Sequence, residues 1–210
     1  GLGDVYKRQH VHRYGPFGYT IPANLPKMDG NRFGQFLNRV YEETRRSRET
    51  FVEHFRDKYG DQHGYLPLWM VSEIMPYGAM FALFTGVEPA IKRSIASIYG
   101  IPDEVLFSWL NVLNMVRNIC AHHGRLWNRE LGLKPRMPKE RKYPEWHYPI
   151  VIPHDRIFSV LTILKYMNSI IAPQSQWPKR LLDLLKEYPD IPRKSMGFPN
   201  GWENSPLWKE

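Results

Sequence analysis

Apolar side chains recur at three- and four-residue steps along most of the chain, the spacing that gives a helix one buried face. The pattern predicts helices over residues 31–60, 66–85, 88–99, 157–171 and 175–188. A further helix is predicted to begin at Pro102-Asp103-Glu104, where the two acids suit its positive end. No stretch of useful length alternates as a strand would. The pattern therefore predicts an all-α helical bundle.

Three polar or proline-containing stretches refine this picture. Asn31 is the predicted cap of the first helix, whose charged middle at residues 42–49 reads as a solvated face. Pro76-Tyr77-Gly78 predicts a kink or break inside residues 66–85. Residues 10–31 contain too much Gly and Pro for a regular element, so a loop or the end of a lost domain is expected there.

Two later segments lack helical periodicity. Residues 131–153 are rich in Pro, Lys, Arg and aromatic side chains, which predicts an irregular crossover loop. The tail over residues 189–210 shows no clear element, but it carries four large apolar side chains that are expected to pack on the bundle as a strap. These are Phe198, Trp202, Leu207 and Trp208.

Residues 1–9 show no periodicity that joins them to the rest of the chain. They begin with Gly and contain a string that looks like translated adapter sequence. They are therefore expected to be a non-native leader, and residues 10–210 are predicted to form one helical domain.

The positive charge is concentrated in one segment. The chain has 29 Lys and Arg against 21 Asp and Glu, a formal net charge of +8. Residues 117–142 contain eight of the basic side chains and only Glu130 and Glu140 as acids. Clustered cations attract polyanions and release counterions on binding them. The segment therefore favours nucleic acid as a partner, with a solubilising surface loop as the equal alternative.

Cysteine content and hydropathy limit the cellular compartments and the kinds of site that are expected for this chain. Cys120 is the single cysteine, so the chain can form neither an internal disulfide nor a cysteine zinc site, which fits the cytoplasm. It is expected to be a small buried side chain. No run reaches the roughly 18 apolar residues that span a bilayer, so no membrane partner is expected. No glycine-rich phosphate loop or metal-ligand motif is present, and neither a metal nor a cofactor is predicted.

The stretch from Arg117 to Arg129 concentrates the candidate chemistry: Arg-Asn-Ile-Cys-Ala-His-His-Gly-Arg-Leu-Trp-Asn-Arg. If the helix runs on to Gly124, the residues Asn118, His122 and Arg125 share one face. An imidazole transfers protons near neutral pH, and a guanidinium holds phosphate. Together they suit cleavage of RNA, whose 2′-hydroxyl is an internal nucleophile. The alternative is that both side chains are structural and pair with backbone or acidic neighbours.

This run resembles the signature of the Abi-like family of bacterial abortive-infection proteins, of the AbiD and AbiF type, in the HEPN superfamily of helical ribonucleases. Residues 66–73 look like the family's Leu-Pro-x-Trp-Met block, and residues 155–173 look like its next helix. The ending Met-Gly-Phe-Pro at residues 196–199, with Pro-Leu-Trp at 206–208, is also similar. The resemblance covers about residues 18–208, and the family's N-terminal helices are expected to be missing from this sequence.

The resemblance implies a HEPN-like bundle and a metal-independent endoribonuclease acting in phage abortive infection or in a toxin–antitoxin-like system. Arg117 and His122 would take the catalytic positions of its Arg, four residues, His motif, and Asn118 would be the polar residue after the Arg. Two copies usually meet in such enzymes, so a homodimer with a composite site is expected. An antitoxin RNA or protein is a further expected partner.

Two residues near Arg117 and His122 each have two possible roles. His123 is either a second proton-transfer group or, because adjacent helical residues point about 100° apart, a structural or RNA-contacting residue. Trp127 either stacks on a base or packs in the core. The predicted RNA-binding residues are Arg125, Arg129, Lys134, Arg136, Lys139, Arg141 and Lys142. Two other functions stay open: a non-catalytic RNA-binding or regulatory module, and a dimer seam with no RNA partner.

Overall fold

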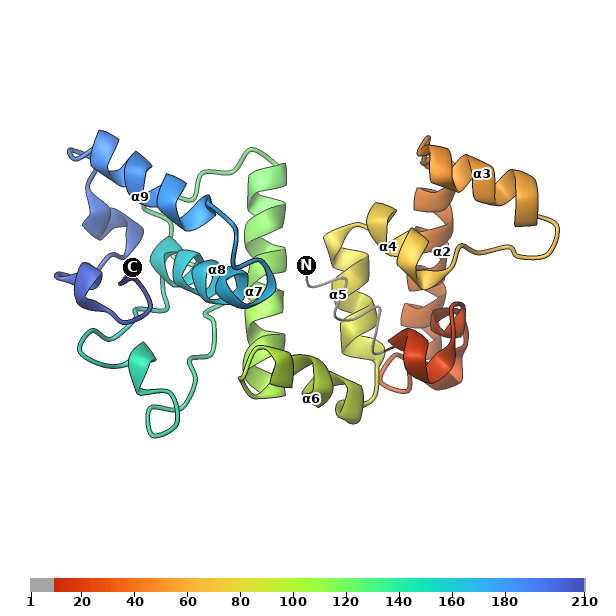
Figure 1. Cartoon of the computed structure of the whole chain (residues 1–210), viewed down its shortest axis with the longest axis horizontal. Coiled ribbons are helices and arrows are strands. Elements are labelled where there is room, and N and C mark those ends of the chain that lie inside the picture. The colour runs from red at the N-terminus through yellow and green to blue at the C-terminus, as the bar shows by residue number, and fades with distance from the viewer. Residues whose placement is uncertain (1–9, 210) are drawn as a thin grey trace. The chain divides into compact units, whose positions relative to one another are not determined.

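The computed structural model describes residues 10–209, and the leader predicted over residues 1–9 lies outside them. The chain divides into two compact units, Gly1–Ser97 and Ile98–Glu210. Within the described residues every regular element is a helix, which confirms the all-α prediction (Figure 1). None of these helices is long and apolar enough to cross a membrane. The single domain predicted over residues 10–210 stays a prediction.

The first unit contains two helices where the sequence predicted one. Helix α2 is Gly30–Arg46 and α3 is Thr50–Tyr59, so the continuous helix predicted over residues 31–60 is wrong. The chain is extended at Ser47 and Glu49, and the Ser47 hydroxyl accepts the Glu49 backbone N–H at 3.3 Å. Such local bonds offer the backbone an alternative to the helix. The cap of α2 is also not Asn31 but Asp29, whose carboxylate accepts the N–H of Arg32 at 2.9 Å.

Proline interrupts the apolar stretch of the first unit, as predicted. Helix α4 is Leu68–Ile74 and α5 is Tyr77–Gly86, with Met75 extended ahead of Pro76. Both helices pack against α2, and α6, Pro89–Ile98, follows. The predicted loop over residues 10–31 holds more structure than expected: residues 10–14 are helical, and 3-10 turns cover Gly18–Thr20 and Pro22–Asn24.

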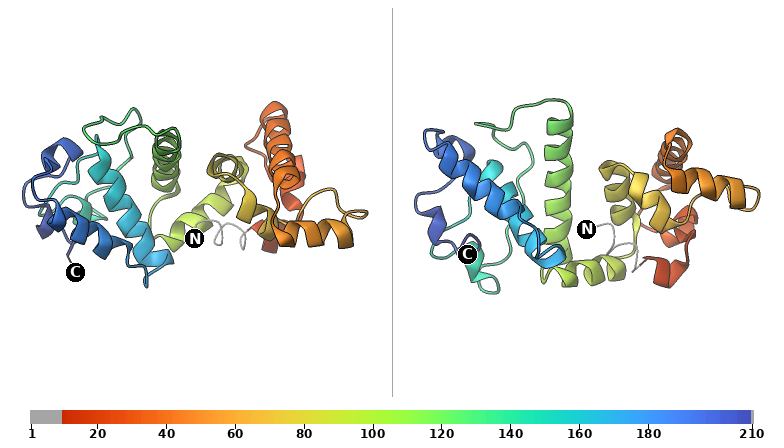
Figure 2. Two further views of the ribbon diagram at one scale, coloured as in Figure 1. Left: turned by 90° about the horizontal axis from the view of Figure 1, so that it is seen from above. Right: turned by 45° about the horizontal axis from the view of Figure 1, so that its top comes forward.

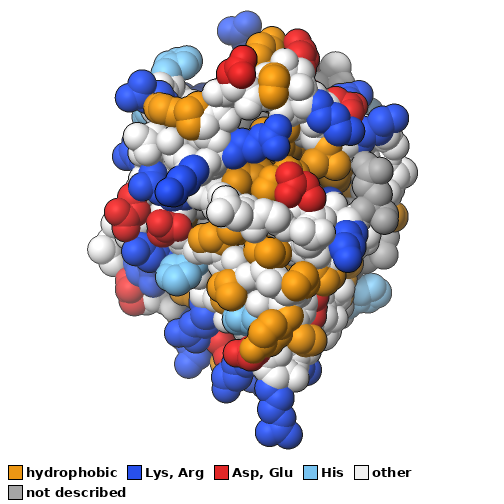
Figure 3. All heavy atoms as spheres, turned by 90° about the vertical axis from the view of Figure 1, so that its left-hand side faces the viewer, with side chains coloured by type: hydrophobic (Ala, Val, Ile, Leu, Met, Phe, Trp, Pro, Cys, Tyr) orange, Lys and Arg blue, Asp and Glu red, His pale blue; other side chains and the backbone are white. Residues whose placement is uncertain are grey.

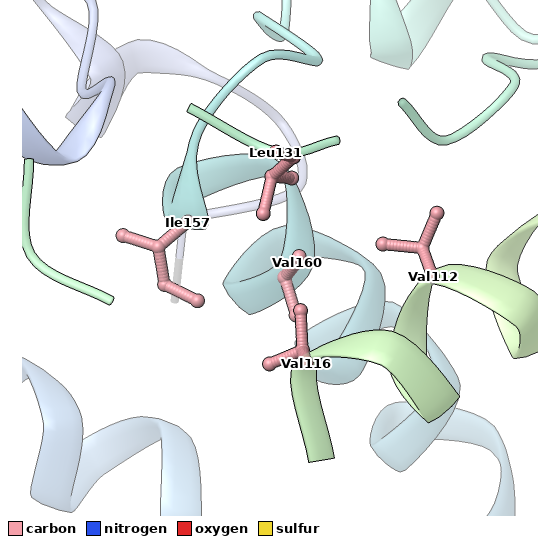
Figure 4. Close-up of a cluster of buried hydrophobic side chains, with 5 residues drawn as sticks. All are labelled: Val112, Val116, Leu131, Ile157 and Val160. Atoms are coloured by element: carbon pink, nitrogen blue, oxygen red, sulfur yellow. The ribbon is translucent and has the colours of Figure 1, made fainter. Parts of the chain in front are cut away.

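The second unit is built on two long helices. Helix α7 is Asp103–Ala121, with the two acids in its first turn as predicted, and α8 is Ile157–Ile171, the predicted range. They pack through a buried cluster that also includes Leu131 from the segment between them (Figure 4). Helix α9 is Trp177–Glu187. Figure 4 draws the cluster side chains: Val112, Val116, Leu131, Ile157 and Val160.

The segment between α7 and α8 is irregular but fixed in place. It leaves the end of α7 and runs back along that helix before it reaches α8 (Figures 1 and 2). The backbone N–H of Arg136 donates to the Ser108 hydroxyl at 2.8 Å, and the Trp109 indole donates to the Arg136 carbonyl at 2.9 Å. Farther along, the Tyr143 hydroxyl donates to the Gly100 carbonyl at 2.9 Å. The crossover is therefore tied to the first half of α7 and to the residues just before that helix.

The C-terminal tail packs on the helices, as predicted, and its contacts are with α8. Phe198, Trp202 and Trp208 are buried, and their rings surround Phe158 of α8 at centroid distances of 4.4–6.2 Å. The Trp208 indole N–H donates to the hydroxyl of Thr162 at 2.9 Å, which satisfies the one polar atom of the buried ring.

Candidate active site at the end of helix α7

Helix α7 ends in a Schellman motif. His122 is the residue that follows the last helical position, and His123 adopts a left-handed conformation with φ of 55°. The Gly124 N–H donates to the Ile119 carbonyl at 2.7 Å, and the His123 N–H donates to the Cys120 carbonyl at 3.0 Å. These two bonds satisfy carbonyls that the helix end leaves open. The chain therefore reverses direction directly after the two histidines.

This ending separates the candidate residues into two groups. The His122 N–H still donates to the Asn118 carbonyl at 3.1 Å, so these two residues stay one helical turn apart. Arg125 lies beyond the reversal, and the helical face that it was predicted to share with Asn118 and His122 is wrong. The left-handed backbone also gives His123 a structural role in ending the helix.

A hollow of about 540 Å³ lies beside the last turns of α7. The helix contributes three asparagines and His122 to its lining, and the following segment contributes Arg129 and Leu133. The lining residues are Asn111, Asn114, Met115, Asn118, Ile119, His122, Gly124, Arg129 and Leu133. His122 and Arg129 are both exposed, so an imidazole and a guanidinium face one space that is open to solvent.

Arg117 is exposed and reaches this group through Asn118. One of its guanidinium nitrogens, Nη1, donates to the Asn118 side-chain oxygen at 3.4 Å, a long hydrogen bond. Arg117 is not itself part of the lining of the hollow. Asn118 thus contacts the guanidinium and lines the same hollow as His122. An anion held there would meet a permanent cation and a group able to give or take a proton.

Arg129 is held by its neighbours on both sides. Asn128 has a left-handed backbone with φ of 56°, and its side-chain oxygen accepts the Arg156 guanidinium at 3.0 Å. Leu131 is 3% exposed in the cluster of Figure 4, and its N–H donates to the Asp155 carbonyl at 2.7 Å. Two anchored residues therefore hold the backbone that presents Arg129 to the hollow.

The other predicted RNA-binding side chains are exposed but only partly gathered. Lys134 pairs with Glu130 at 3.1 Å, and the Lys142 ammonium lies 5.6 Å from the centre of the Tyr143 ring. Arg125, Arg136, Lys139 and Arg141 are also exposed. On the face drawn in Figure 3, Lys and Arg side chains are scattered and do not form one patch.

Two smaller expectations have different outcomes. Cys120 is exposed, so its predicted burial is wrong. It lies in the last turn of α7 and is not part of the buried cluster that α7 forms with α8. Trp127 is 39% exposed, which leaves its ring open to solvent and disfavours the core alternative. Within residues 10–209 no group of three or more His, Cys, Asp or Glu side chains is arranged to hold a metal ion.

Sequence reasoning missed two members of the site, Asn111 and Asn114. Their spacing to Asn118 and His122, three or four residues at each step, was the available signal. It was hidden because the same helix carries a stronger apolar stripe on its other side.

Comparison with known proteins places this motif in a family. A family model described as "Abi-like protein" matches residues 4–128, which include all of α7 and the reversal after it. The match ends before most of the basic crossover. No curated protein and no solved structure matches the chain significantly.

Proposed function

The chain belongs to the Abi-like protein family, which points to a part in phage abortive infection, and we propose that this part is the cleavage of RNA by a metal-independent, HEPN-type endoribonuclease. The family match supports the coarser role. The finer one depends on the end of α7, where the exposed Arg117 guanidinium donates to Asn118, and Asn118 lines an open hollow together with the exposed His122.

The proposed reaction is a transesterification within the RNA. The ribose 2′-oxygen attacks the adjacent phosphorus and forms a 2′,3′-cyclic phosphate, while the bond from phosphorus to the 5′-oxygen breaks. One proton leaves the 2′-hydroxyl and one is delivered to the departing 5′-oxygen. One copy of His122 carries out one of these two proton transfers, and Arg117 stabilises the additional negative charge on the phosphoryl oxygens. The nucleophile belongs to the substrate itself.

A homodimer would supply the second proton-transfer group. One imidazole cannot act as base and acid at the same instant, whereas His122 from each of two copies can do both. We therefore propose a composite site in which two α7 ends meet. The RNA substrate places the reaction in the bacterial cytoplasm, and an antitoxin RNA or protein that covers the same site would restrain it.

The test is cleavage of total cellular RNA by the full chain in EDTA, with the ends analysed for 2′,3′-cyclic phosphate. His122→Ala and Arg117→Ala are each expected to slow cleavage by about 10²- to 10⁴-fold. His154→Ala and Arg180→Ala change exposed residues of the same types outside the site and are expected to keep the wild-type rate. Wild-type rates in both site variants would refute the proposal. Binding without cut ends would leave the RNA-binding module instead.

A further inference from the structure

A pocket of about 400 Å³ lies within the first unit of the chain. Its lining comes from the last turns of α2, from α3 and from the loop over residues 60–66. The hollow beside α7 belongs to the second unit, and the two linings have no residue in common. Pockets of roughly 300–1,000 Å³ are typical of small-molecule sites. This pocket is therefore a candidate for a ligand other than the RNA proposed above.

The break between α2 and α3 creates the pocket. Because the chain is extended at Ser47 and Glu49, α3 leaves the end of α2 at an angle (Figure 1). The Arg56 guanidinium of α3 donates to the carbonyl oxygen of Thr44 in the last turn of α2, one of the carbonyls that a helix end leaves open. A guanidinium has five N–H groups, so Arg56 can keep this bond and still donate to a ligand.

Aromatic side chains border the pocket. Phe55 and Tyr65 belong to the lining, together with Tyr41 and His63. His63 stacks on Phe17 at a centroid distance of 4.4 Å, so one face of its ring is already covered. The Tyr41 side chain is 49% exposed, and its ring is open to solvent. Such a ring can stack on a flat ring of a ligand.

The charged side chains of the lining are cationic. Arg45 and Arg56 border the pocket, and among the residues that the structure describes no Asp or Glu does so. Tyr41 and Arg45 are four residues apart on α2, so the ring and the guanidinium lie on one face of the helix. The Glu42 carboxylate lies 3.3 Å from Arg45 and 3.9 Å from Arg46, so two guanidiniums share one acid. Positive charge stays in excess, which favours an anionic ligand.

We propose that this pocket binds a free nucleoside monophosphate, whose base lies against Tyr41 and whose phosphate is held by Arg45 and Arg56. Such a ligand joins a flat ring system to an anion, the two features that the lining suits. A phosphate monoester carries up to two negative charges, which matches two guanidiniums better than a carboxylate would. Stacking uses the face of the base, so any base is accepted. The inference goes beyond the cleavage of RNA, because it adds a small-molecule site in the other unit.

The experiment is isothermal titration calorimetry of the full chain with AMP, and with adenosine and inorganic phosphate as the two parts of that ligand. AMP is expected to bind about tenfold more tightly than either part. Tyr41→Ala is expected to weaken AMP binding about fivefold or more, and Arg45→Gln about tenfold. Tyr188→Ala, at a tyrosine that is 48% exposed, and Arg39→Gln, at an exposed arginine of α2 outside the lining, are expected to keep the affinity of the wild type.

Four outcomes would overturn the proposal. They are no binding of AMP, equal affinities for AMP and adenosine, unchanged affinity in both pocket variants, and equal losses in the two control variants. Tyr41→Leu removes the ring but keeps an apolar side chain, and it is the second variant should Tyr41→Ala lose its circular dichroism.

A further arm separates a free nucleotide from the end of an RNA. A 5′-phosphorylated octa-adenylate is titrated into the chain carrying His122→Ala, so that it is not cut. If it binds more tightly than AMP and Arg45→Gln weakens it, the pocket is a site for RNA ends and the assignment to a free nucleotide is overturned. AMP binding that depends on Tyr41 and Arg45, in a chain that cuts no RNA, supports the pocket and refutes only the nuclease.

Discussion

The backbone N–H of Gly124 donates to the carbonyl oxygen of Ile119 at 2.7 Å, and this bond fixes the place where helix α7 stops. A β-carbon on Gly124 would lie 2.7 Å from Ile119 Cγ2 and 2.9 Å from the Ile119 carbonyl oxygen. The close approach of the two residues therefore requires glycine. Their contact also determines where His122 lies, because His122 is enclosed between Ile119 and Gly124 in the turn that ends the helix.

Gly124→Ala is expected to lower the free energy of unfolding by about 1–3 kcal/mol, since the added carbon forces the turn away from Ile119. Urea denaturation followed by circular dichroism measures the change. Gly132→Ala is the matched control, because a β-carbon there would meet nothing within 4 Å. Equal stability of the two variants would show that the turn accommodates the extra carbon at no cost.

His123→Gly is expected to raise the free energy of unfolding by about 1 kcal/mol, because glycine adopts the left-handed conformation without the steric cost that a β-carbon brings. Cleavage should stay at the wild-type rate if the residue serves only to end the helix. Asn128→Gly tests the other left-handed position, where the gain is offset by loss of the 3.0 Å bond from Arg156. A large fall in cleavage by His123→Gly would instead assign His123 to the chemistry.

Glu130→Gln is expected to increase RNA affinity, because it frees Lys134 from its 3.1 Å ion pair. Arg129→Ala should decrease affinity and reduce the slope of log affinity against log salt by about 0.7, the contribution of one phosphate contact on a single strand. Anisotropy titrations over a range of salt concentrations measure both. Glu187→Gln makes the same change in net charge on an exposed residue of α9 and should have a much smaller effect. Equal gains from the two glutamate variants would contradict a specific role for Lys134.

The free energy of unfolding is expected to fall as the pH is lowered from 6.5 to 4. Burial lowers the pKa of His10 from 6.5 to about 4, and this effect outweighs that of the hydrogen bond with the Gly18 backbone, which raises the pKa. The unfolded chain then binds a proton that the folded chain does not, so this contribution is complete above pH 6.5 and is lost as the pH falls towards 4. The loss amounts to at most about 3 kcal/mol.

Urea titrations at several pH values would measure this loss. His10→Gln should flatten the profile between pH 4 and 6.5, and His12→Gln, an exposed neighbour, should leave it unchanged. A profile of wild-type steepness in the His10 variant would assign the pH dependence to other groups.

The helices were predictable where apolar periodicity marks the buried face or where a proline marks the end of a helix. Residues 157–171 form α8 as predicted, and Pro76 separates α4 from α5. The break at Ser47–Glu49 was missed, because no Gly or Pro marks it and only a serine hydroxyl competes with the helix.

The site was predictable only in part. The motif located His122 and Arg117, but not the reversal after them, because glycine usually occupies the left-handed position and here a histidine does. The hollow beside α7 could not be predicted, since part of its lining comes from a segment without any periodic pattern. Its position depends on bonds such as that from Trp109 to Arg136, between residues 27 apart in the chain.

The crossover is bonded to α7 near both ends of the stretch from Gly124 to Arg136, so its length matters as well as its charge. One inserted residue would add up to about 3.5 Å of chain with no free end to take it up. The excess would have to bulge outward between the two attachments, and Arg129 would shift out of register with His122. Spacing in this apparently featureless stretch is thus a geometric constraint comparable to that within a regular helix.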